Sequence, residues 1–169
     1  ASRITGRKEV LVPKIISPRR LSIIWNFCQP SVMPGHIDVE LVNYDPETGM
    51  LDLEDLKSKI SLKTAGVYFE NPSYLGIIEA QGEEISKIAH KNGAESIVGV
   101  DPISLGVLAP PAEYGADIVC GEVQPLGIHM HCGGGLCGFI ASRDEEKYVG
   151  EYPSLLISIT DTQREDEYA

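Results

Sequence analysis

Alternating strand-like and helix-like segments are the feature of this sequence that most constrains its fold. Short apolar runs recur along the chain, and most are followed by a segment whose apolar residues return every three or four positions. Alternation of this kind predicts an α/β fold with a mostly parallel sheet and helices on both faces. The strands are expected over Glu9–Pro13, Ile37–Asn43, Ala65–Glu70, Ser96–Val100, Ala116–Cys120 and Gly138–Ser142.

Local signals mark where the helices between these strands begin and end. Ser17 followed by Pro18 predicts one helix start, and Asp52 is placed to cap another. A further helix is expected over about Glu79–Asn92, with Gly93 as its left-handed C-terminal cap. The apolar residues expected to face inward are Leu21, Ile24, Trp25 and Cys28 in the first helix, Leu53, Leu56 and Ile60 in the second, and Ile85, Ile88 and Ala89 in the third.

The size and charge of the chain exclude several classes of protein. Its 169 residues suit a single domain over residues 1–169. A net charge of −11, from 14 basic and 25 acidic residues, argues against nucleic acid as a general partner. The charge is uneven, because residues 1–20 alone carry +5. The apolar runs are all far shorter than the roughly 20 residues that a membrane span needs, so no membrane partner is expected.

The cysteines and histidines do not form a recognisable disulfide framework or metal site. Four cysteines without regular spacing make a reducing cytoplasm the expected location. Cys28 lies on an apolar helical stripe and Cys120 ends a strand, so both are expected to be small buried hydrophobic residues. The H-x-H-C-x4-C pattern at residues 129–137 matches no usual zinc finger, and we expect no metal site there.

Two polar residues follow predicted strands, where ligands of parallel α/β proteins bind. Asp101 comes directly after an apolar strand, so its carboxylate is placed either to pair with a cationic ligand nitrogen or to form the turn at Pro102. Asn71 precedes Pro72, so its side chain either fixes a ligand oxygen or forms an Asx turn. Both alternatives remain open from the residues alone.

A glycine run in the last third of the chain is a further candidate for close approach of a ligand. Gly133–Gly135 and Gly138 would let backbone N–H groups reach an anion without a Cβ clash. A structural turn between strands is an equally good explanation, since the segment contains neither a Walker lysine nor a G-x-G-x-x-G fingerprint.

Two stretches resemble motifs of the glycine decarboxylase P-protein family. Residues 68–79 read YFENPSYLGIIE and resemble the ENP-x-[YF]-x-G-x-x-E stretch of that family. Residues 121–127 (GEVQPLG) and 133–139 (GGGLCGF) resemble a second signature. The similarity runs over essentially the whole chain and is greatest to the first, or alpha, subunit of the two-subunit bacterial form.

This resemblance implies a fold, an activity and partners. The fold would be part of the large domain of the pyridoxal phosphate (PLP)-dependent transferases, fold-type I and aspartate-aminotransferase-like. The family decarboxylates glycine and passes the aminomethyl group to lipoyl-H-protein. Asp101 matches the aspartate that pairs with the PLP pyridine nitrogen, and Asn71 would be a second, partial cofactor contact. A protonated ring is the electron sink that such chemistry needs.

A departure from the family motif sets this chain's role within that activity. The PLP-bearing subunit has a His-Lys-Thr segment before its glycine run, and the lysine forms the Schiff base. The corresponding residues here are Gln124, Pro125 and Leu126, and residues 92–142 contain no lysine. Pro125 therefore stands at the expected Schiff-base position, and we expect no catalytic residue and no covalent cofactor in this chain. The resemblance assigns PLP to a partner, the beta subunit.

The length of the chain is a second departure from the family. Alpha subunits of the family are far longer, so the amino-terminal region and the carboxyl-terminal small domain are expected to be absent. Apolar residues within Leu155–Ile159 would then be uncovered and adhesive. Two alternatives are another enzyme of the PLP fold, which would need a lysine after the strand at Ala116–Cys120, and a non-catalytic binding subunit that completes a heteromer.

Overall fold

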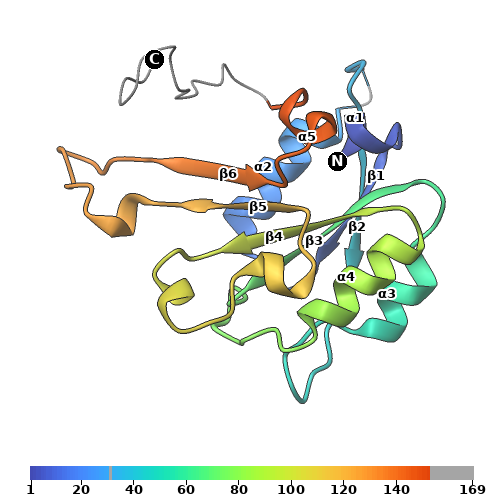
Figure 1. The fold of residues 1–169 in the computed structure, drawn as a ribbon, viewed down its shortest axis with the longest axis horizontal. Coiled ribbons are helices and arrows are strands. Elements are labelled where there is room, and N and C mark those ends of the chain that lie inside the picture. The colour runs from blue at the N-terminus through green and yellow to red at the C-terminus, as the bar shows by residue number, and fades with distance from the viewer. Residues whose placement is uncertain (31, 153–169) are drawn as a thin grey trace, which may run out of the picture.

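The computed structural model describes residues 1–30 and 32–152, in which six strands form one sheet (Figure 1). The predicted apolar segment Leu155–Ile159 lies outside the described residues. The strand order is β2-β1-β3-β4-β5-β6. The strands are β1 (Glu9–Pro13), β2 (Asp38–Val42), β3 (Thr64–Asn71), β4 (Glu95–Val100), β5 (Ile118–Glu122) and β6 (Gly138–Ser142).

The sheet is parallel except at one edge, which confirms the predicted fold class. β1 to β5 pair in parallel, and β6 returns antiparallel to β5 through a hairpin. β1 and β6 have the bounds that the sequence predicts, whereas β5 begins two residues later than expected. Nearly every residue of the central strands β3 and β4 is buried.

Helices and short 3-10 turns connect the strands, and two predicted caps are confirmed. The Asp52 carboxylate accepts hydrogen bonds from the backbone N–H groups of Glu54 and Asp55, at 3.0 and 3.1 Å. Gly93 follows the third predicted helix with φ of 67°. The helices are α1 (Ser2–Thr5), α2 (Pro18–Cys28), α3 (Leu53–Lys59), α4 (Gly82–Lys91) and α5 (Glu146–Val149), and the 3-10 turns are η1 (Ser104–Gly106), η2 (Pro111–Tyr114) and η3 (Gln124–Leu126).

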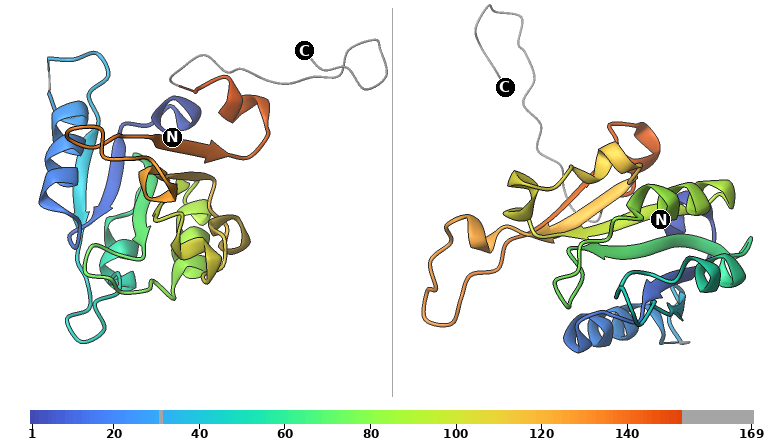
Figure 2. Two further views of the ribbon diagram at one scale, coloured as in Figure 1. Left: turned by 90° about the vertical axis from the view of Figure 1, so that its left-hand side faces the viewer. Right: turned by 90° about the horizontal axis from the view of Figure 1, so that it is seen from below.

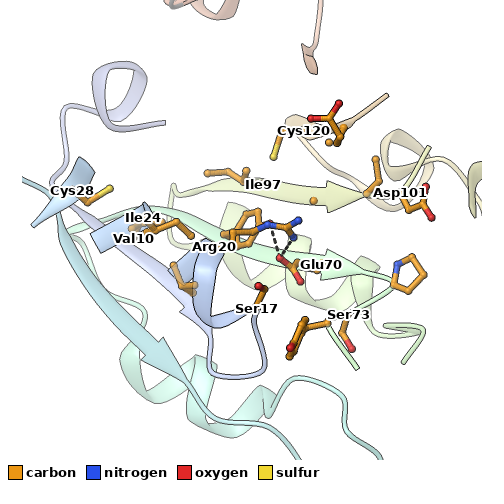
Figure 3. A pocket seen from close by; sticks show the side chains of 18 of the residues that line it. Val10, Ser17, Arg20, Ile24, Cys28, Glu70, Ser73, Ile97, Asp101 and Cys120 are labelled. Carbon is orange, nitrogen blue, oxygen red and sulfur yellow. Dashed lines mark hydrogen bonds and ion pairs between the residues drawn. The ribbon is translucent and has the colours of Figure 1, made fainter. Parts of the chain in front are cut away.

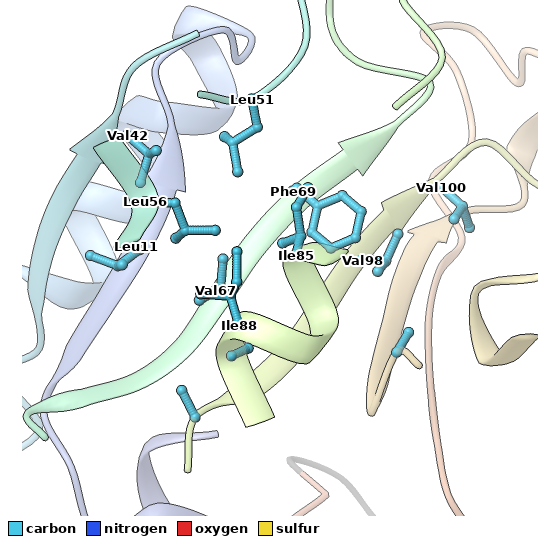
Figure 4. Packing of buried hydrophobic residues seen from close by; sticks show 13 residues of the cluster. Leu11, Val42, Leu51, Leu56, Val67, Phe69, Ile85, Ile88, Val98 and Val100 are labelled. Atoms are coloured by element: carbon cyan, nitrogen blue, oxygen red, sulfur yellow. The ribbon is translucent and has the colours of Figure 1, made fainter. Parts of the chain in front are cut away.

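The hydrophobic core lies between one face of the sheet and helices α3 and α4 (Figure 4). Alternate residues of each strand point to this face because side chains alternate along a strand. Phe69 of β3 is 1% exposed and packs at the centre of the cluster. The other large members are Leu11, Val42, Leu51, Leu56, Val67, Ile85, Ile88, Val98 and Val100.

The opposite face of the sheet is only partly covered. α2 lies over it on the side of β1 and β2 (Figure 2). At the amino ends of the central strands, α1 contacts β3, and the Tyr148 hydroxyl of α5 donates to Glu95 of β4 at 2.7 Å. None of the residues of α2 is buried, and Trp25 is 39% exposed. The prediction that the apolar face of α2 is buried is therefore wrong. Cys28, which the sequence placed in the core, is only half-buried.

Ser17 and Pro18 begin α2 as the sequence predicts, although the Ser17 side chain makes no capping hydrogen bond. Among residues 1–30 and 32–152 no helix is both long and apolar enough to cross a membrane.

Candidate functional site

A cavity of about 660 Å³ occupies the partly covered face of the sheet (Figure 3). This volume falls within the range of small-molecule sites, roughly 300–1,000 Å³. Its floor consists of side chains from β1, β3, β4 and β5, and its wall is the sheet-facing side of α2. Small residues deepen the floor, because a Cβ at Gly99 would collide with the Tyr68 hydroxyl.

The cavity contains a buried carboxylate. Glu70 is 5% exposed, and its Oε1 accepts hydrogen bonds from the Arg20 guanidinium and, at 2.9 Å, from the Tyr68 hydroxyl. Burial and the nearby negative charge of Glu70 raise the pKa of Tyr68 well above its usual value, so the phenol stays protonated and donates. The three side chains tie α2 to the centre of the sheet.

The thiol of Cys120 also borders the cavity and is only half-buried, so it does not lie in the closed core that the sequence predicts. Desolvation by burial raises its pKa from the ordinary value of 9.0, and the charge of Arg20 opposes this only in part. The thiolate is the nucleophilic form of cysteine, so burial lowers the fraction of Cys120 that is in its reactive form.

Asp101 lies at the carboxyl end of β4 and borders the same cavity. Its Oδ1 accepts a hydrogen bond from the backbone N–H of Ile103 at 3.0 Å. Its carbonyl oxygen accepts from the N–H and hydroxyl of Ser104, at 3.0 and 2.6 Å. The turn-forming role is thus present, and the exposed carboxylate still stands at the edge where a ligand would lie.

Asn71 points the other way. β3 alternates, so Tyr68 and Glu70 face the cavity while Asn71 faces the core side. Its Oδ1 accepts from the N–H of Glu79 at 3.1 Å, and its Nδ2 donates to the Glu79 carbonyl at 3.4 Å. The side chain closes the loop that begins at the cis Asn71–Pro72 peptide. Its role as a cofactor contact stays a prediction.

Pro125 lies in η3 just after β5 and borders the cavity. In the described part of the chain, three carboxylates line the cavity, those of Glu70, Asp101 and Glu122, against the single guanidinium of Arg20. The Glu122 Oε1 accepts from the backbone N–H groups of Gln124 and Cys137, at 3.0 and 2.5 Å. Among the residues that the structure describes, the cavity therefore offers an acid that suits a pyridinium nitrogen, but no amine for a Schiff base and no uncommitted cation for a phosphate.

The glycine run lies away from this cavity. It is part of the long β5–β6 hairpin, which extends beyond the edge of the sheet (Figure 1). Gly133 and Gly134 have φ of 150° and 96°, which favours glycine. Within the described part of the chain, no group of three or more His, Cys, Asp or Glu side chains is placed to hold a metal ion.

The Arg20–Glu70–Tyr68 network was missed at the level of the sequence. One signal was available, because Glu70 follows five uncharged residues in the strand predicted over Ala65–Glu70. A charge in such a run is costly unless it is paired. The partner was not predictable, since Arg20 is fifty residues away in the chain.

Comparison with known proteins gives one family. Residues 1–168 match the model of the glycine cleavage system P-protein family. The chain is 40% identical over 155 residues to a probable glycine dehydrogenase (decarboxylating) subunit 1 of Staphylothermus marinus. The matched region covers 92% of this chain and 32% of that protein. It is also 41% identical over 162 residues to a protein of the same description from Aeropyrum pernix, and this match covers 95% of this chain and 34% of that protein. The chain thus spans about a third of the length of these relatives.

Solved structures give the same fold. A crystal structure of glycine decarboxylase (P-protein) of the glycine cleavage system, in inhibitor-bound form, superposes with a TM-score of 0.80 at 30% identity, over 96% of this chain and 34% of that chain. A putative O-acetylhomoserine (thiol)-lyase of Campylobacter jejuni, which carries N'-pyridoxyl-lysine-5'-monophosphate, superposes with a TM-score of 0.60 at 21% identity, over 82% of this chain and 31% of that chain. The latter likeness concerns the fold alone, which is that of PLP-dependent enzymes.

Proposed function

Because the chain belongs to the glycine cleavage system P-protein family, we propose that it is part of the first subunit of a two-subunit glycine dehydrogenase (decarboxylating). The family match over residues 1–168 carries this proposal, and the relatives described as subunit 1 support it. The substrate would be glycine, and the aminomethyl group would pass to lipoyl-H-protein. The described residues would form part of the large domain, and the cytoplasm is the proposed location.

The cavity does not fit a complete PLP site. PLP, when bound by an enzyme, supplies an electron sink for the carbanion left by decarboxylation. Residues 1–30 and 32–152 bring no lysine to the cavity, and the one guanidinium that they bring is already paired with Glu70. We therefore place the covalent cofactor in the second subunit and assign this chain a supporting role, which is to complete the heteromer.

Asp101 and Asn71 are then partial remains of a cofactor site in this chain. Asp101 keeps the position and exposure that a contact to a pyridinium nitrogen needs. Asn71 is committed to the backbone of Glu79, which argues for a structural role in its present arrangement. An alternative function as another PLP-fold enzyme is weaker, because residues 92–142 provide no lysine after β5.

The exchange of bicarbonate carbon into the carboxyl group of glycine tests the proposed function. The natural full-length chain, its second subunit and lipoyl-H-protein should together catalyse this exchange. Omitting either subunit should abolish it, because one would hold the cofactor and the other would complete the site. Exchange by the second subunit alone at the full rate would contradict the proposal.

Asp101→Ala should reduce exchange by the assembled enzyme only modestly, about threefold or less, whereas removing a ring-protonating carboxylate usually costs far more. The reason is that Asp101 here borders a cavity without a Schiff-base lysine. The matched control replaces the corresponding aspartate of the second subunit. Equally severe losses from both replacements would show that this chain houses a working site.

A further inference from the structure

The motif at residues 68–79 ends in Glu79, a buried residue to which the proposed function gives no role. Glu79 is 7% exposed, and none of the ion pairs found among the described residues includes it. Removing a carboxylate from water is costly, so its other contacts must offset the loss. It lies just before the first turn of α4, where the positive end of the helix dipole favours a negative group.

Both oxygens of the Glu79 carboxylate accept hydrogen bonds from N–H groups. Oε2 accepts from the backbone N–H of Leu51 at 2.7 Å. Oε1 accepts from the backbone N–H of Gln81 at 3.2 Å and from the Gln81 Nε2 at 3.1 Å. The same Nε2 also donates to the Leu51 carbonyl at 3.0 Å. The carboxylate therefore joins the segment before α3 to the segment before α4.

These bonds close the base of the loop at residues 72–78. Asn71 at the start of the loop is bonded to the backbone of Glu79 at its end, at 3.1 and 3.4 Å. At the tip of the loop, by contrast, Tyr74 and Leu75 are 54% and 64% exposed. Within the described residues, the loop is thus held at its base rather than by burial of its tip.

The loop forms one rim of the cavity. β3 pairs with β4 so that Asn71 lies opposite Val100. The residues that follow, Pro72 and Asp101, therefore leave the sheet side by side. Ser73 borders the cavity together with them (Figure 3). A shift of the loop would thus change the surroundings of the Asp101 carboxylate.

We propose that Glu79 holds the loop 72–78 against the edge of the sheet and so fixes the rim of the cavity beside Asp101. The contacts involved lie within this chain, so the inference stands apart from the proposed function. Its chemical requirement is an acceptor at both oxygens. A carboxamide has one acceptor oxygen and one NH2 donor, so in either orientation it would face an N–H of Leu51 or Gln81 with a second donor.

The test is amide hydrogen exchange in the natural full-length chain, read by mass spectrometry on peptides from the loop and from β4. Glu79→Gln should speed exchange in residues 72–78 about tenfold or more, as expected when a buried N–H loses its acceptor. Peptides from β4 should keep their exchange rates. Glu84→Gln is the matched control, because it makes the same chemical change at an exposed position of α4.

A second pair of variants leaves Glu79 in place and changes its donor. Gln81→Lys keeps a donor within reach of the Glu79 carboxylate and should preserve slow exchange in the loop. Gln81→Glu faces that carboxylate with another one and should speed exchange in the loop as Glu79→Gln does. This pair decides the question even where Glu79→Gln does not fold.

Three results would overturn the inference. The first is loop exchange in Glu79→Gln within about twofold of that in the unaltered chain, since the loop would then be held by other contacts. The second is equal acceleration in the loop and in β4, which would mean that Glu79 supports the whole fold and not the loop. The third is equal loop exchange in Gln81→Lys and Gln81→Glu, which would show that the bond to the carboxylate does not hold the loop.

Discussion

Borohydride reduction of the assembled enzyme in the presence of PLP should attach the pyridoxyl group to the second subunit and leave this chain unlabelled at any single site. The reason is chemical: we propose that Pro125 occupies the position of the family motif's lysine, and a proline side chain has no amine that can bind an aldehyde. Peptide mapping by mass spectrometry measures the label. We expect all of the site-specific label in the second subunit and none in this chain.

The electrostatics of the cavity strengthen this expectation. The described residues contribute three carboxylates to its lining and one guanidinium, which is held by Glu70. An anionic phosphate would meet net repulsion there. Weak labelling scattered over surface lysines would agree with the prediction, because those amines react without a built site. A stoichiometric pyridoxyl-lysine at one position of this chain would overturn the assignment of the cofactor to the second subunit.

The fold was largely predictable from local signals in the sequence. The apolar strand Glu9–Pro13 and the cap Asp52 each depend on residues that are near one another in the chain, and both were located correctly. β5 was placed two residues early, since its register with β4 begins at Ile118, one residue after Asp117. Its carboxylate accepts from the N–H of Ser96 at 2.8 Å and pairs with His90 at 2.6 Å. Hydrogen bonds and ion pairs of this kind join segments that are distant in the chain, so they leave no periodic pattern in the sequence.

The site was less predictable than the fold, for physical reasons. The position of Asp101 follows from a strand end, and the structure does place it at the cavity. The direction of Asn71 depends on the phase of alternation in β3, which shifts with a one-residue change of register. The apolar spacing that begins at Leu21 in α2 looked like a buried face, because periodicity reports which residues are apolar and not which of them find a neighbour.

Phe69→Ala should cost about 3–5 kcal/mol of unfolding free energy, the usual loss when a buried aromatic side chain is truncated. Phe69 is 1% exposed in a central strand. Its ring lies 6.3 Å from that of Tyr114, centroid to centroid. The alanine would leave a cavity that the neighbouring backbone of β3 and β4 cannot close, because both strands are held by their ladder bonds. Urea denaturation followed by circular dichroism measures the loss.

Phe27→Ala is the matched control, since it removes the same atoms from a side chain that is 73% exposed. It should change the unfolding free energy by less than about 0.5 kcal/mol, as surface substitutions usually do. The difference between the two variants then reports burial rather than the loss of a phenyl ring as such. Equal losses from the two variants would mean that Phe69 is not enclosed. The packing of α4 on the sheet would then differ from the one described. The same packing orients the edge of the sheet at the carboxyl ends of the strands, where Asp101 lies.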